Sequence, residues 1–401
     1  MTDDRKTPTE RIDRALAELQ GACTRWARLP ARELLEVLDS VIDGLGRVGE
    51  RWVRTCCEVK GIDPNGPVAG EEWIGLGISF RQAHMLRRSL KDLARDERPH
   101  IPGPVSLNAK GAPTAQVMPR VRGDGVVFDG MEAYVEFQPG MDIGDVTAGQ
   151  AAAYADPPDT GQVAAVLGAG NQACLTTGDV LHKLFVERRA VTFKPNPVLA
   201  ALGPLMEEAF EELVRRGVLA VVYGGSEEGR HLVEHDMVDE VHMTGARSTY
   251  DAIVYGGAVG SERVTDKRFT AELGNVSPVI VVPGAWTDED LRMQARYLAA
   301  TLVHNAGFNC LTTHLVLTHG AWNRREAFLD ALRDALQRVP CRRAWYPHAR
   351  EQWDRAMEAH PEAETFGGGA EGELPWTLVT GVEPAPEEPM VSGEHFCAVA
   401  A

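Results

Sequence analysis

Cys310 is the residue whose surroundings in the sequence best fit a reactive group. It ends the segment HNAGFNC at residues 304–310, which has the pattern of a helix end, a glycine turn and the start of an apolar strand. A nucleophilic thiol needs access to its substrate and some thiolate character, and backbone N–H groups at a turn can lower its pKa. The segment therefore predicts a reactive Cys310, with a cysteine packed inertly in the core as the alternative.

Two segments, one ending at this cysteine and one upstream of it, follow a known pattern. NAGFNC, residues 305–310, resembles the Asn-x-Gly-Gln-x-Cys signature of the aldehyde dehydrogenase superfamily, with Phe308 in place of the glutamine. TAELGNVSP, residues 270–278, resembles the Glu-Leu-Gly-Gly-Lys-x-Pro segment of the same family. By this resemblance the chain is identified as a member of that superfamily.

The resemblance implies a covalent route for the oxidation of an aldehyde to a carboxylic acid. Cys310 would attack the carbonyl of a small-molecule aldehyde to give a thiohemiacetal, whose hydride passes to NAD or NADP. Glu272 would then activate the water that cleaves the thioester, because this hydrolysis needs a deprotonated water beside a base. Without Cys310, Glu272 would be interpreted as a solvated charge beside a turn.

Asn171 is expected to complete the catalytic set. It lies in LGAGNQ, residues 167–172, at the end of an apolar strand, and matches a family asparagine by position. The resemblance implies that its side-chain amide and the backbone N–H of Cys310 form an oxyanion hole. The aromatic and proline neighbours usual in the family are replaced here by Gly170 and Gln172, and an asparagine after a glycine is otherwise a common turn residue.

Lys194 is the first of the expected cofactor-binding residues. It lies in TFKPNP, residues 192–197, and matches the family lysine that contacts the adenosine ribose. Pro197 stands where many NAD-preferring members carry a glutamate that binds the ribose hydroxyls. Because no carboxylate there would repel a 2′-phosphate, the choice between NAD and NADP stays open.

Three shorter segments complete the expected cofactor site by resemblance. GSEEG, residues 225–229, resembles a glycine-bounded turn before a helix, and HMTGA, residues 242–246, resembles the Phe-Thr-Gly-Ser segment. EHFCAV, residues 394–399, resembles Glu-x-Phe-Gly-Pro-Val, whose glutamate holds the nicotinamide ribose. The residues expected to contact the cofactor in these segments are Gly225, Gly229, Thr244, Gly245 and Glu394.

Two other functions remain open at the level of sequence. An acylating relative, an acyl-CoA reductase, would pass the acyl group to or from coenzyme A and would not need Glu272 to activate water. A dinucleotide-binding member without turnover would need no thiol, base and amide in these positions. Glu272 favours the hydrolytic dehydrogenase over the first alternative, and the joint presence of Cys310, Glu272, Asn171 and Lys194 argues against the second.

The elements that must position these residues alternate between strand and helix. Short runs with strand patterns at 163–170, 190–195, 219–225 and 239–245 are separated by helical stretches, one of which spaces Leu202 to Leu213 by three and four residues before Gly217. This alternation predicts an α/β fold with a doubly wound parallel sheet that binds a dinucleotide at its strand ends. Strand and helix patterns restart after Glu272 and predict a second α/β domain, the catalytic one.

The remaining segments divide the chain into two expected domains. Residues 8–96 have amphipathic helical patterns, and residues 97–160 are rich in proline, glycine and short alternating runs, with a hairpin or connecting segment near 128–160. We therefore expect residues 1–271 to form a helical N-terminal region and the dinucleotide-binding domain. Residues 272–401 would form the catalytic domain, incomplete at its C-terminus because family members continue beyond this point into a segment that helps to build an oligomer.

The composition of the chain argues against several classes of binding partner. A formal net charge of −17 gives no broad positive field for nucleic acid or a membrane surface, and no apolar run is long enough to span a bilayer. The seven cysteines have no CxxC spacing and no paired histidine motif, so that neither a disulfide framework nor a metal site is expected. The N-terminus lacks the pattern of a secretory signal, which predicts a cytoplasmic enzyme that could form a homo-oligomer.

Overall fold

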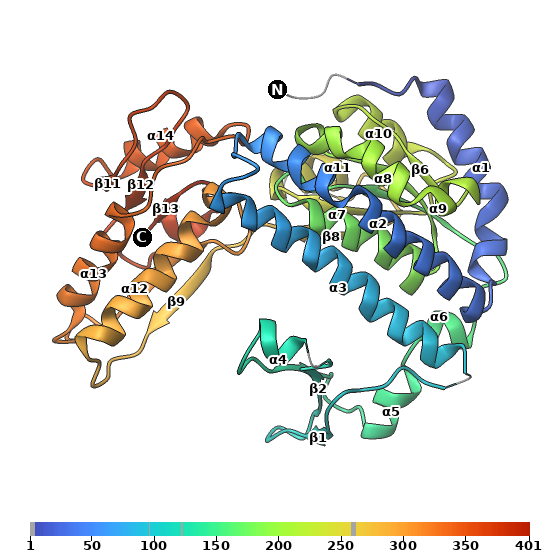
Figure 1. Cartoon of the computed structure of the whole chain (residues 1–401), viewed down its shortest axis with the longest axis horizontal. Helices are drawn as coiled ribbons and strands as arrows, with labels where there is room; N and C mark the ends of the chain where they lie inside the picture. The colour runs from blue at the N-terminus through green and yellow to red at the C-terminus, as the bar shows by residue number, and fades with distance from the viewer. Residues whose placement is uncertain (1–4, 96, 122, 258–261) are drawn as a thin grey trace.

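The chain begins with long amphipathic helices, as its sequence predicts. The computed structural model describes residues 5–95, 97–121, 123–257 and 262–401 (Figure 1). Helix α1 spans Thr9–Ala27, α2 spans Ala31–Lys60 and, after the short 3-10 turn η1 at Pro67–Ala69, α3 spans Gly70–Leu93. Gly61, with φ of 68°, ends α2 in the left-handed conformation that glycine adopts without strain.

A five-stranded parallel sheet forms the centre of the cofactor domain. Its strands stand in the order β6-β5-β4-β7-β8 and are β4 (Val163–Leu167), β5 (Ala190–Lys194), β6 (Leu219–Val221), β7 (Glu240–Gly245) and β8 (Arg268–Leu273). Every neighbouring pair is parallel, and β4 and β5 are almost entirely buried, as strands covered on both faces must be. The predicted doubly wound fold is therefore confirmed. Glu272 lies on β8, so that the expected boundary at residue 271 falls within this sheet.

Helices pack on both sides of this sheet. Helix α1 contacts β4, β5 and β6, whereas α2 and α3 run across the molecule and pack against α8 and α7, respectively (Figure 1). The covering elements are α7 (Ala173–Leu181), the π-helical turn η2 (His182–Val186), η3 (Pro197–Leu202), α8 (Gly203–Ala209), α9 (Glu211–Arg215), α10 (Ser226–Glu234) and α11 (Arg247–Tyr255). The helix predicted between Leu202 and Leu213 is broken at Phe210, where φ is −106° and ψ is 23°. Gly217 has φ of 67°, as expected for a left-handed cap.

A small antiparallel sheet separates the helical region from the central sheet in sequence. It contains β1 (Val105–Leu107), β2 (Pro113–Met118) and β3 (Ala133–Glu136), followed by the short helices α5 (Ile143–Ala148) and α6 (Ala152–Ala155); α4 (Asp124–Val127) lies between β2 and β3. The hairpin expected near 128–160 thus begins earlier in the chain, because β3 pairs back with β2. In Figure 1 this sheet lies below α3.

The second lobe follows β8 and carries Cys310, the residue expected to be the nucleophile. Its elements are β9 (Ser277–Val281), α12 (Asp288–Val303), η4 (His304–Gly307), β10 (Thr313–Thr318), α13 (Arg325–Gln337), α14 (Ala349–Ala359), β11 (Glu364–Phe366), β12 (Trp376–Leu378), α15 (Pro389–Ser392) and β13 (Val399–Ala400). Strands β9 and β10 are parallel, and Ala401 exchanges backbone hydrogen bonds with His314 and Val316 of β10. Cys310 lies in the segment between η4 and β10.

A buried ion pair joins two of the N-terminal helices. The ammonium of Lys60 on α2 lies 2.7 Å from a carboxylate oxygen of Glu72 on α3, and their side chains are only 1% and 4% exposed. The same ammonium lies 5.1 Å from the ring centroid of Trp345 in the second lobe. Lys60 thus connects three segments at one buried point. None of the helices within the described residues is long and apolar enough to cross a membrane.

Candidate active site

The turn that carries the nucleophile, residues 304–310, has an unusual backbone. Asn305, Ala306 and Gly307 have φ values of 53°, 56° and 84°, which are three successive left-handed positions. A Cβ at Gly307 would lie 2.7 Å from the backbone nitrogen of Ala398, closer than side chains approach backbone atoms. Both the dihedral angle and the close approach require glycine at this position. The nucleophile turn is therefore packed directly against the segment that follows Glu394.

Two asparagines hold the nucleophile turn against the cofactor domain. The side-chain amide of Asn305 donates to the carbonyl oxygens of Phe308 at 2.9 Å and Asn171 at 3.2 Å. The side-chain amide of Asn171 donates to the carbonyl of Phe308 at 3.0 Å. Both asparagines are buried. The backbone N–H of Asn305 donates to Glu71 at 3.1 Å, and Glu71 also pairs with Arg342 at 2.9 Å. The structure thus brings Asn171 into hydrogen-bond contact with the turn that ends at Cys310.

Cys310 is partly buried, and its environment favours the neutral thiol. Burial raises the pKa of Cys310 most, and the charges of Glu394 and then Glu272 raise it further. The backbone N–H groups of Cys310 and Leu311 lower it, but by less. The turn N–H groups therefore act in the expected direction, but burial and two carboxylates outweigh them and leave the pKa of Cys310 raised. Asn275 donates its side-chain amide to the Cys310 carbonyl at 2.8 Å and so ties the segment after β8 to the nucleophile.

Glu272 projects from β8 toward an open cavity. Its partner in the neighbouring strand is Thr244, and its side chain is exposed. The cavity has a volume of about 620 Å³ and lies between α3, α7, η2 and the strands β7 and β8. Its polar lining residues include Arg81, Gln82, Asp179, His182, His242 and Thr270, together with Glu272 itself. Glu272 thus stands where water can reach it, and its charge raises the pKa of Cys310.

Glu394 lies on the other side of the thiol. Burial raises the pKa of Glu394 to about 7, against a hydrogen bond from the backbone N–H of Asn275 that lowers it. A side chain at Gly274 would collide with the carboxylate, so the backbone after β8 forms one wall of its site. Its Oε1 atom is buried and makes no hydrogen bond to any described residue. A buried carboxylate oxygen without a donor indicates a place where a ligand hydroxyl or water is to be bound.

The residues expected to bind the adenosine half of the cofactor lie together. Lys194 ends β5 and is buried, which lowers its pKa, while the charge of Glu228 raises it. A Cβ at Gly229 would lie 3.6 Å from the Lys194 side chain, so the lysine runs beside the first turn of α10. The backbone N–H of Gly225 donates to Glu228 at 2.7 Å and shapes that turn.

Thr244 and Gly245 end β7, beside Glu272 and Leu273 of β8. The hydroxyl of Thr244 donates to Asp179 at 2.9 Å, on the side of the catalytic cavity. The structure therefore places this pair of cofactor candidates between the strand that carries Glu272 and helix α7.

Comparisons with known proteins agree on one family. The model of the aldehyde dehydrogenase family matches residues 171–350, the span that contains Asn171, Glu272 and Cys310. Over these residues the chain is similar to the aldehyde dehydrogenase family. It is 31% identical over 167 residues to N-succinylglutamate 5-semialdehyde dehydrogenase 1 of Caulobacter vibrioides, an alignment that covers 41% of this chain and 33% of that protein. It is also 31% identical over 153 residues to the vanillin dehydrogenase of an Amycolatopsis species, covering 38% and 29%.

Solved structures of aldehyde dehydrogenases share the fold over nearly the whole chain. Aldehyde dehydrogenase C of Pseudomonas syringae, in complex with NAD+ and octanal, has a TM-score of 0.68 at 14% identity, and the match covers 98% of this chain and 72% of that one. NADP-dependent glyceraldehyde-3-phosphate dehydrogenase of Bacillus halodurans, in complex with NADP, has a TM-score of 0.67 at 17% identity, with 98% and 73% covered. At these identities the likeness supports the fold alone. The sequence matches span about a third of the curated relatives' length.

An aromatic cluster explains two departures from the aldehyde dehydrogenase motifs. Phe308, which replaces the motif glutamine, is buried, and its ring stacks on that of Tyr346 with 5.6 Å between the ring centroids. The ring of Trp345 meets it edge-on, and that of Phe396 is tilted against it. The hydroxyl of Tyr346 lies where a side chain on Gly170 would project, 2.8 Å from a Cβ built there. An aromatic residue at position 170, as in aldehyde dehydrogenases, would have no room. Residue types alone did not single out Tyr346, because it meets these motifs only through the fold.

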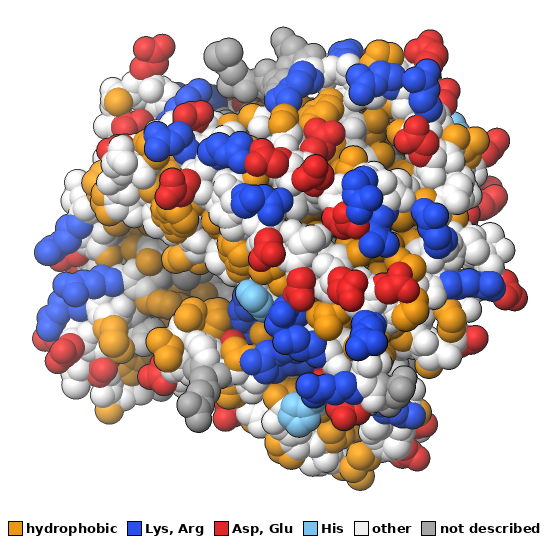
Figure 2. Space-filling view, turned by 45° about the vertical axis from the view of Figure 1, so that its right-hand side comes forward, with side chains coloured by type: hydrophobic (Ala, Val, Ile, Leu, Met, Phe, Trp, Pro, Cys, Tyr) orange, Lys and Arg blue, Asp and Glu red, His pale blue; other side chains and the backbone are white. Residues whose placement is uncertain are grey.

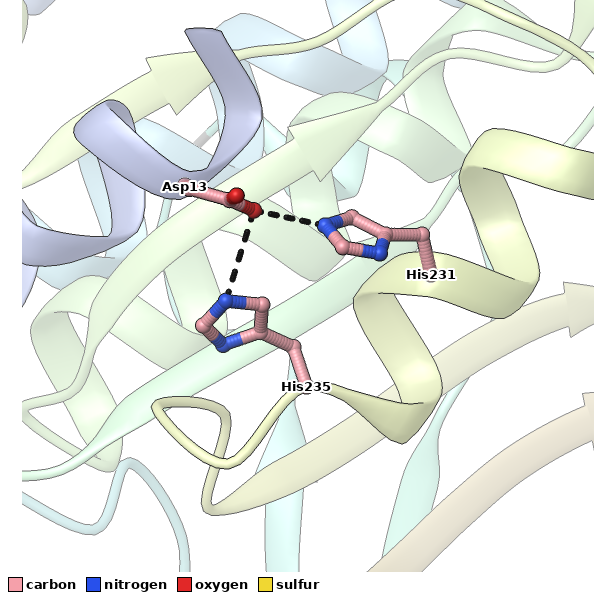
Figure 3. A group of neighbouring side chains, drawn as sticks. All are labelled: Asp13, His231 and His235. Atoms are coloured by element: carbon pink, nitrogen blue, oxygen red, sulfur yellow. Dashed lines mark hydrogen bonds and ion pairs between the residues drawn. The ribbon is translucent and has the colours of Figure 1, made fainter. Parts of the chain in front are cut away.

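Asp13, His231 and His235 form a cluster of potential metal ligands outside the dehydrogenase site (Figure 3). An oxygen of Asp13 on α1 lies 2.6 Å from Nε2 of His231 and 3.4 Å from Nε2 of His235, at the end of α10. Nδ1 of His235 accepts the backbone N–H of Met237 at 3.1 Å, which puts the proton of a neutral ring on Nε2. That atom cannot then donate an electron pair to a metal, and we interpret the cluster as a hydrogen-bonded tie between α1 and α10.

Proposed function

We propose that this chain carries the active site of an NAD(P)-dependent aldehyde dehydrogenase that oxidises an aldehyde to a carboxylic acid. The observation that supports this most is the grouping of Cys310 with two carboxylates, Glu272 and Glu394, beside the buried amide of Asn171. A thiol, a base and an amide donor around one point fit acyl chemistry with a covalent intermediate. The family match over residues 171–350 supports the same reaction class.

The first step is addition of the Cys310 sulfur to the aldehyde carbon. A C–S bond forms, and the carbonyl electron pair moves to oxygen, which becomes an oxyanion. One N–H of the Asn171 amide is bonded to Phe308, and among the described residues no acceptor occupies the second. That second N–H and the backbone N–H of Cys310 are the donors we assign to the oxyanion.

Loss of the Cys310 proton is the step that this environment makes most demanding. Burial and two carboxylates raise the pKa of the thiol, so that the resting group is protonated at neutral pH. Glu394, whose pKa is raised to about 7, is matched to accept a proton near that pH, and Glu272 is the second acceptor within electrostatic reach. We assign the first proton transfer to this pair.

The cofactor supplies one piece of chemistry: NAD or NADP, when bound, accepts the hydride from the carbon attached to Cys310. The described residues fit this group at two points. Lys194 lies buried beside the glycine-bounded turn at the start of α10, and Glu394 holds an oxygen without a hydrogen-bond donor, as a ribose hydroxyl would require. We propose Gly225, Gly229, Thr244 and Gly245 as the neighbouring contacts.

Hydrolysis completes the reaction through Glu272. After hydride loss the substrate carbon is a thioester of Cys310, and Glu272 removes a proton from a water that attacks this carbon. The C–S bond breaks, the electron pair returns to sulfur and the carboxylic acid leaves. Glu272 faces an open cavity that water can enter, and a base for water is needed for hydrolysis but not for acyl transfer to coenzyme A.

Cofactor reduction on a panel of aldehydes tests this proposal. The purified protein is incubated with octanal, vanillin and N-succinylglutamate 5-semialdehyde, with NAD or NADP and with or without coenzyme A. We expect reduced cofactor and free acid without coenzyme A, and loss of both in Cys310→Ala, with Cys174→Ala as the control for a buried cysteine outside the site. Turnover that requires coenzyme A would overturn the hydrolytic assignment, and turnover retained in Cys310→Ala would overturn the mechanism.

Two properties of the whole protein remain proposals. We propose a cytoplasmic protein and a homo-oligomer, as the family resemblance implies. Light scattering after size-exclusion chromatography of the purified chain measures the second directly, and a monomer at all concentrations would contradict it.

A further inference from the structure

A second cleft opens beside the catalytic cavity and is lined by cations. It has a volume of about 800 Å³ and lies between the C-terminal half of α3 and residues 97–121. Among the described residues, its positively charged lining residues are Arg81, Arg87, Arg88, Lys91, Arg95 and Arg120, joined by His84 and His100, against two acids, Asp92 and Glu97. Figure 2 shows basic side chains gathered together with histidines on the lower part of one face.

This charge contrasts with the rest of the molecule. The chain carries a formal net charge of −17, yet the described residues that line this cleft include six Lys or Arg residues and two acids. A concave site with walls of low dielectric constant concentrates such a local field and raises the local concentration of anions. The acidic surface elsewhere on the chain would repel the same anions, so that anions would bind in the cleft rather than at other parts of the surface.

Several of these cations have no partner to neutralise them. Arg81 pairs with Asp124 at 3.0 Å and Arg87 pairs with Asp39, so these two are held in place. Arg88, Lys91 and Arg95 form no ion pair with any residue that the structure describes. Helical spacing brings residues 81, 84, 88, 91 and 95 to one side of α3 and its end, at intervals of three and four residues.

Arg120 lies close enough to other cations of the cleft to be repelled by them. Its guanidinium is about half buried, and burial lowers its pKa most. Arg88 and Arg81 lower the pKa further, and Asp92 alone opposes them. A buried guanidinium beside like charges costs free energy that a bound anion would recover. Proteins retain such arrangements mainly where a ligand supplies the missing charge.

The cleft adjoins the cavity that Glu272 lines. Arg81 and Met85 line both, and Glu272 lies in the lining of the cavity. From Arg81 to Arg95 the helix rises roughly 21 Å, at about 1.5 Å per residue. A molecule with its aldehyde near Glu272 could thus place a tail past Arg81 among the unpaired cations.

We propose that this cleft binds the tail of the substrate, and that the preferred aldehydes carry at least two negative charges, as carboxylates or phosphates, at a distance from the aldehyde group. The choice of an aldehyde rests on the proposed function, whereas the anion binding does not. N-succinylglutamate 5-semialdehyde, named for the Caulobacter relative, has this chemistry, with two carboxylates remote from its aldehyde. Vanillin and octanal do not.

The kinetic test compares N-succinylglutamate 5-semialdehyde with its dimethyl ester, which has the same carbon skeleton, one added methyl group on each carboxyl and no charge. We expect kcat/KM for the dianion to fall at least tenfold in Arg88→Glu/Lys91→Glu, and kcat/KM for the ester to change less than twofold. The milder Arg88→Gln/Lys91→Gln should fall between, and salt should lower the rate for the dianion alone. Arg11→Glu/Arg14→Glu on α1 is the matched control, since it changes the net charge equally on exposed residues away from the cleft.

A binding measurement separates this proposal from the proposed function. Titration calorimetry with N-succinylglutamate and, separately, with pyrophosphate needs no turnover, and we expect binding that Arg88→Glu/Lys91→Glu abolishes and the α1 control retains. Tighter binding of N-succinylglutamate identifies a carboxylated tail, and tighter binding of pyrophosphate identifies a phosphorylated one. If no aldehyde is oxidised but this binding is observed, the anion site stands and the dehydrogenase proposal fails. Binding and kcat/KM unchanged in the double variant would overturn the inference.

Discussion

The side-chain amide of Asn171 donates to the backbone carbonyl of Phe308 at 3.0 Å, across 137 positions of sequence. This bond connects the end of the first strand of the cofactor domain to the residue two positions before Cys310. Because Asn171 is buried, its amide cannot turn toward solvent and remains aligned with the nucleophile turn. The donor that we assign to the oxyanion is therefore in place before a substrate arrives.

Replacing Asn171 should impair the chemical step far more than substrate binding. For Asn171→Ala we expect kcat to fall about 10²–10³-fold, the usual cost of one oxyanion donor. Steady-state kinetics with NAD or NADP measures this. Gln172→Ala is the control, because Gln172 donates only to the side chain of Asn309 at 3.0 Å. An equal loss of kcat in both variants would indicate a disturbed turn rather than a lost oxyanion donor.

Glu394 should make stability depend on pH. Its pKa is raised to about 7 in the folded chain by burial, above the ordinary value of 4.5. Folding is thus opposed by ionisation: the penalty is absent below pH 4.5, grows between pH 4.5 and 7, and is complete above pH 7. In urea unfolding from pH 5 to 8, the free energy of unfolding of Glu394→Gln should rise relative to the wild type as pH increases. A difference that is constant over this range would contradict the raised pKa.

Gly307 should tolerate no side chain. Gly307→Ala adds a Cβ at φ of 84° and 2.7 Å from the Ala398 backbone, so we expect a destabilisation of about 1–3 kcal/mol and loss of turnover. Gly46→Ala is the matched control, since Gly46 is exposed within α2 with nothing within 4 Å of a Cβ. That variant should gain about 0.5–1 kcal/mol through helix propensity. Thermal unfolding with parallel assays distinguishes the two, and a stable, active Gly307→Ala would show that the turn can rearrange.

Removing one partner of the buried ion pair between Lys60 and Glu72 should lower the free energy of unfolding, whereas replacing both partners by apolar residues should lower it much less. Glu72→Gln leaves a buried ammonium without its counter-charge and should cost about 3–5 kcal/mol. Lys60→Met/Glu72→Leu removes both charges and should restore most of that stability. Denaturant unfolding of the two variants provides the comparison. If the double variant is as unstable as the single one, the pair has a role beyond its mutual neutralisation, such as the contact of Lys60 with Trp345.

The sequence was sufficient for features that depend on local pattern. Alternating strands and helices and the left-handed Gly217 follow from residue type and spacing, whereas Asn171, Glu272 and Cys310 were singled out by resemblance to family motifs. The break at Phe210 did not, because a continuous apolar stripe does not reveal a single non-helical residue.

Contacts between distant segments were equally beyond reach. The fit of Tyr346 beside Gly170 joins residues far apart in the chain, and so does the link from Glu71 to Asn305. The net direction of the Cys310 pKa shift was beyond reach for the same reason: its burial and the approach of Glu394 arise from the fold, whereas the lowering by the turn N–H groups could be anticipated locally.

Trapping the acyl-enzyme tests the central claim most directly. Glu272→Gln is incubated with an aldehyde and NAD or NADP, then digested and analysed by mass spectrometry. The account predicts that the peptide containing Cys310 gains the mass of the acyl group, that the wild type shows much less, and that Cys310→Ala/Glu272→Gln shows none. An acyl group on another residue, or full turnover by Glu272→Gln with no adduct at Cys310, would contradict the assignment of these two residues.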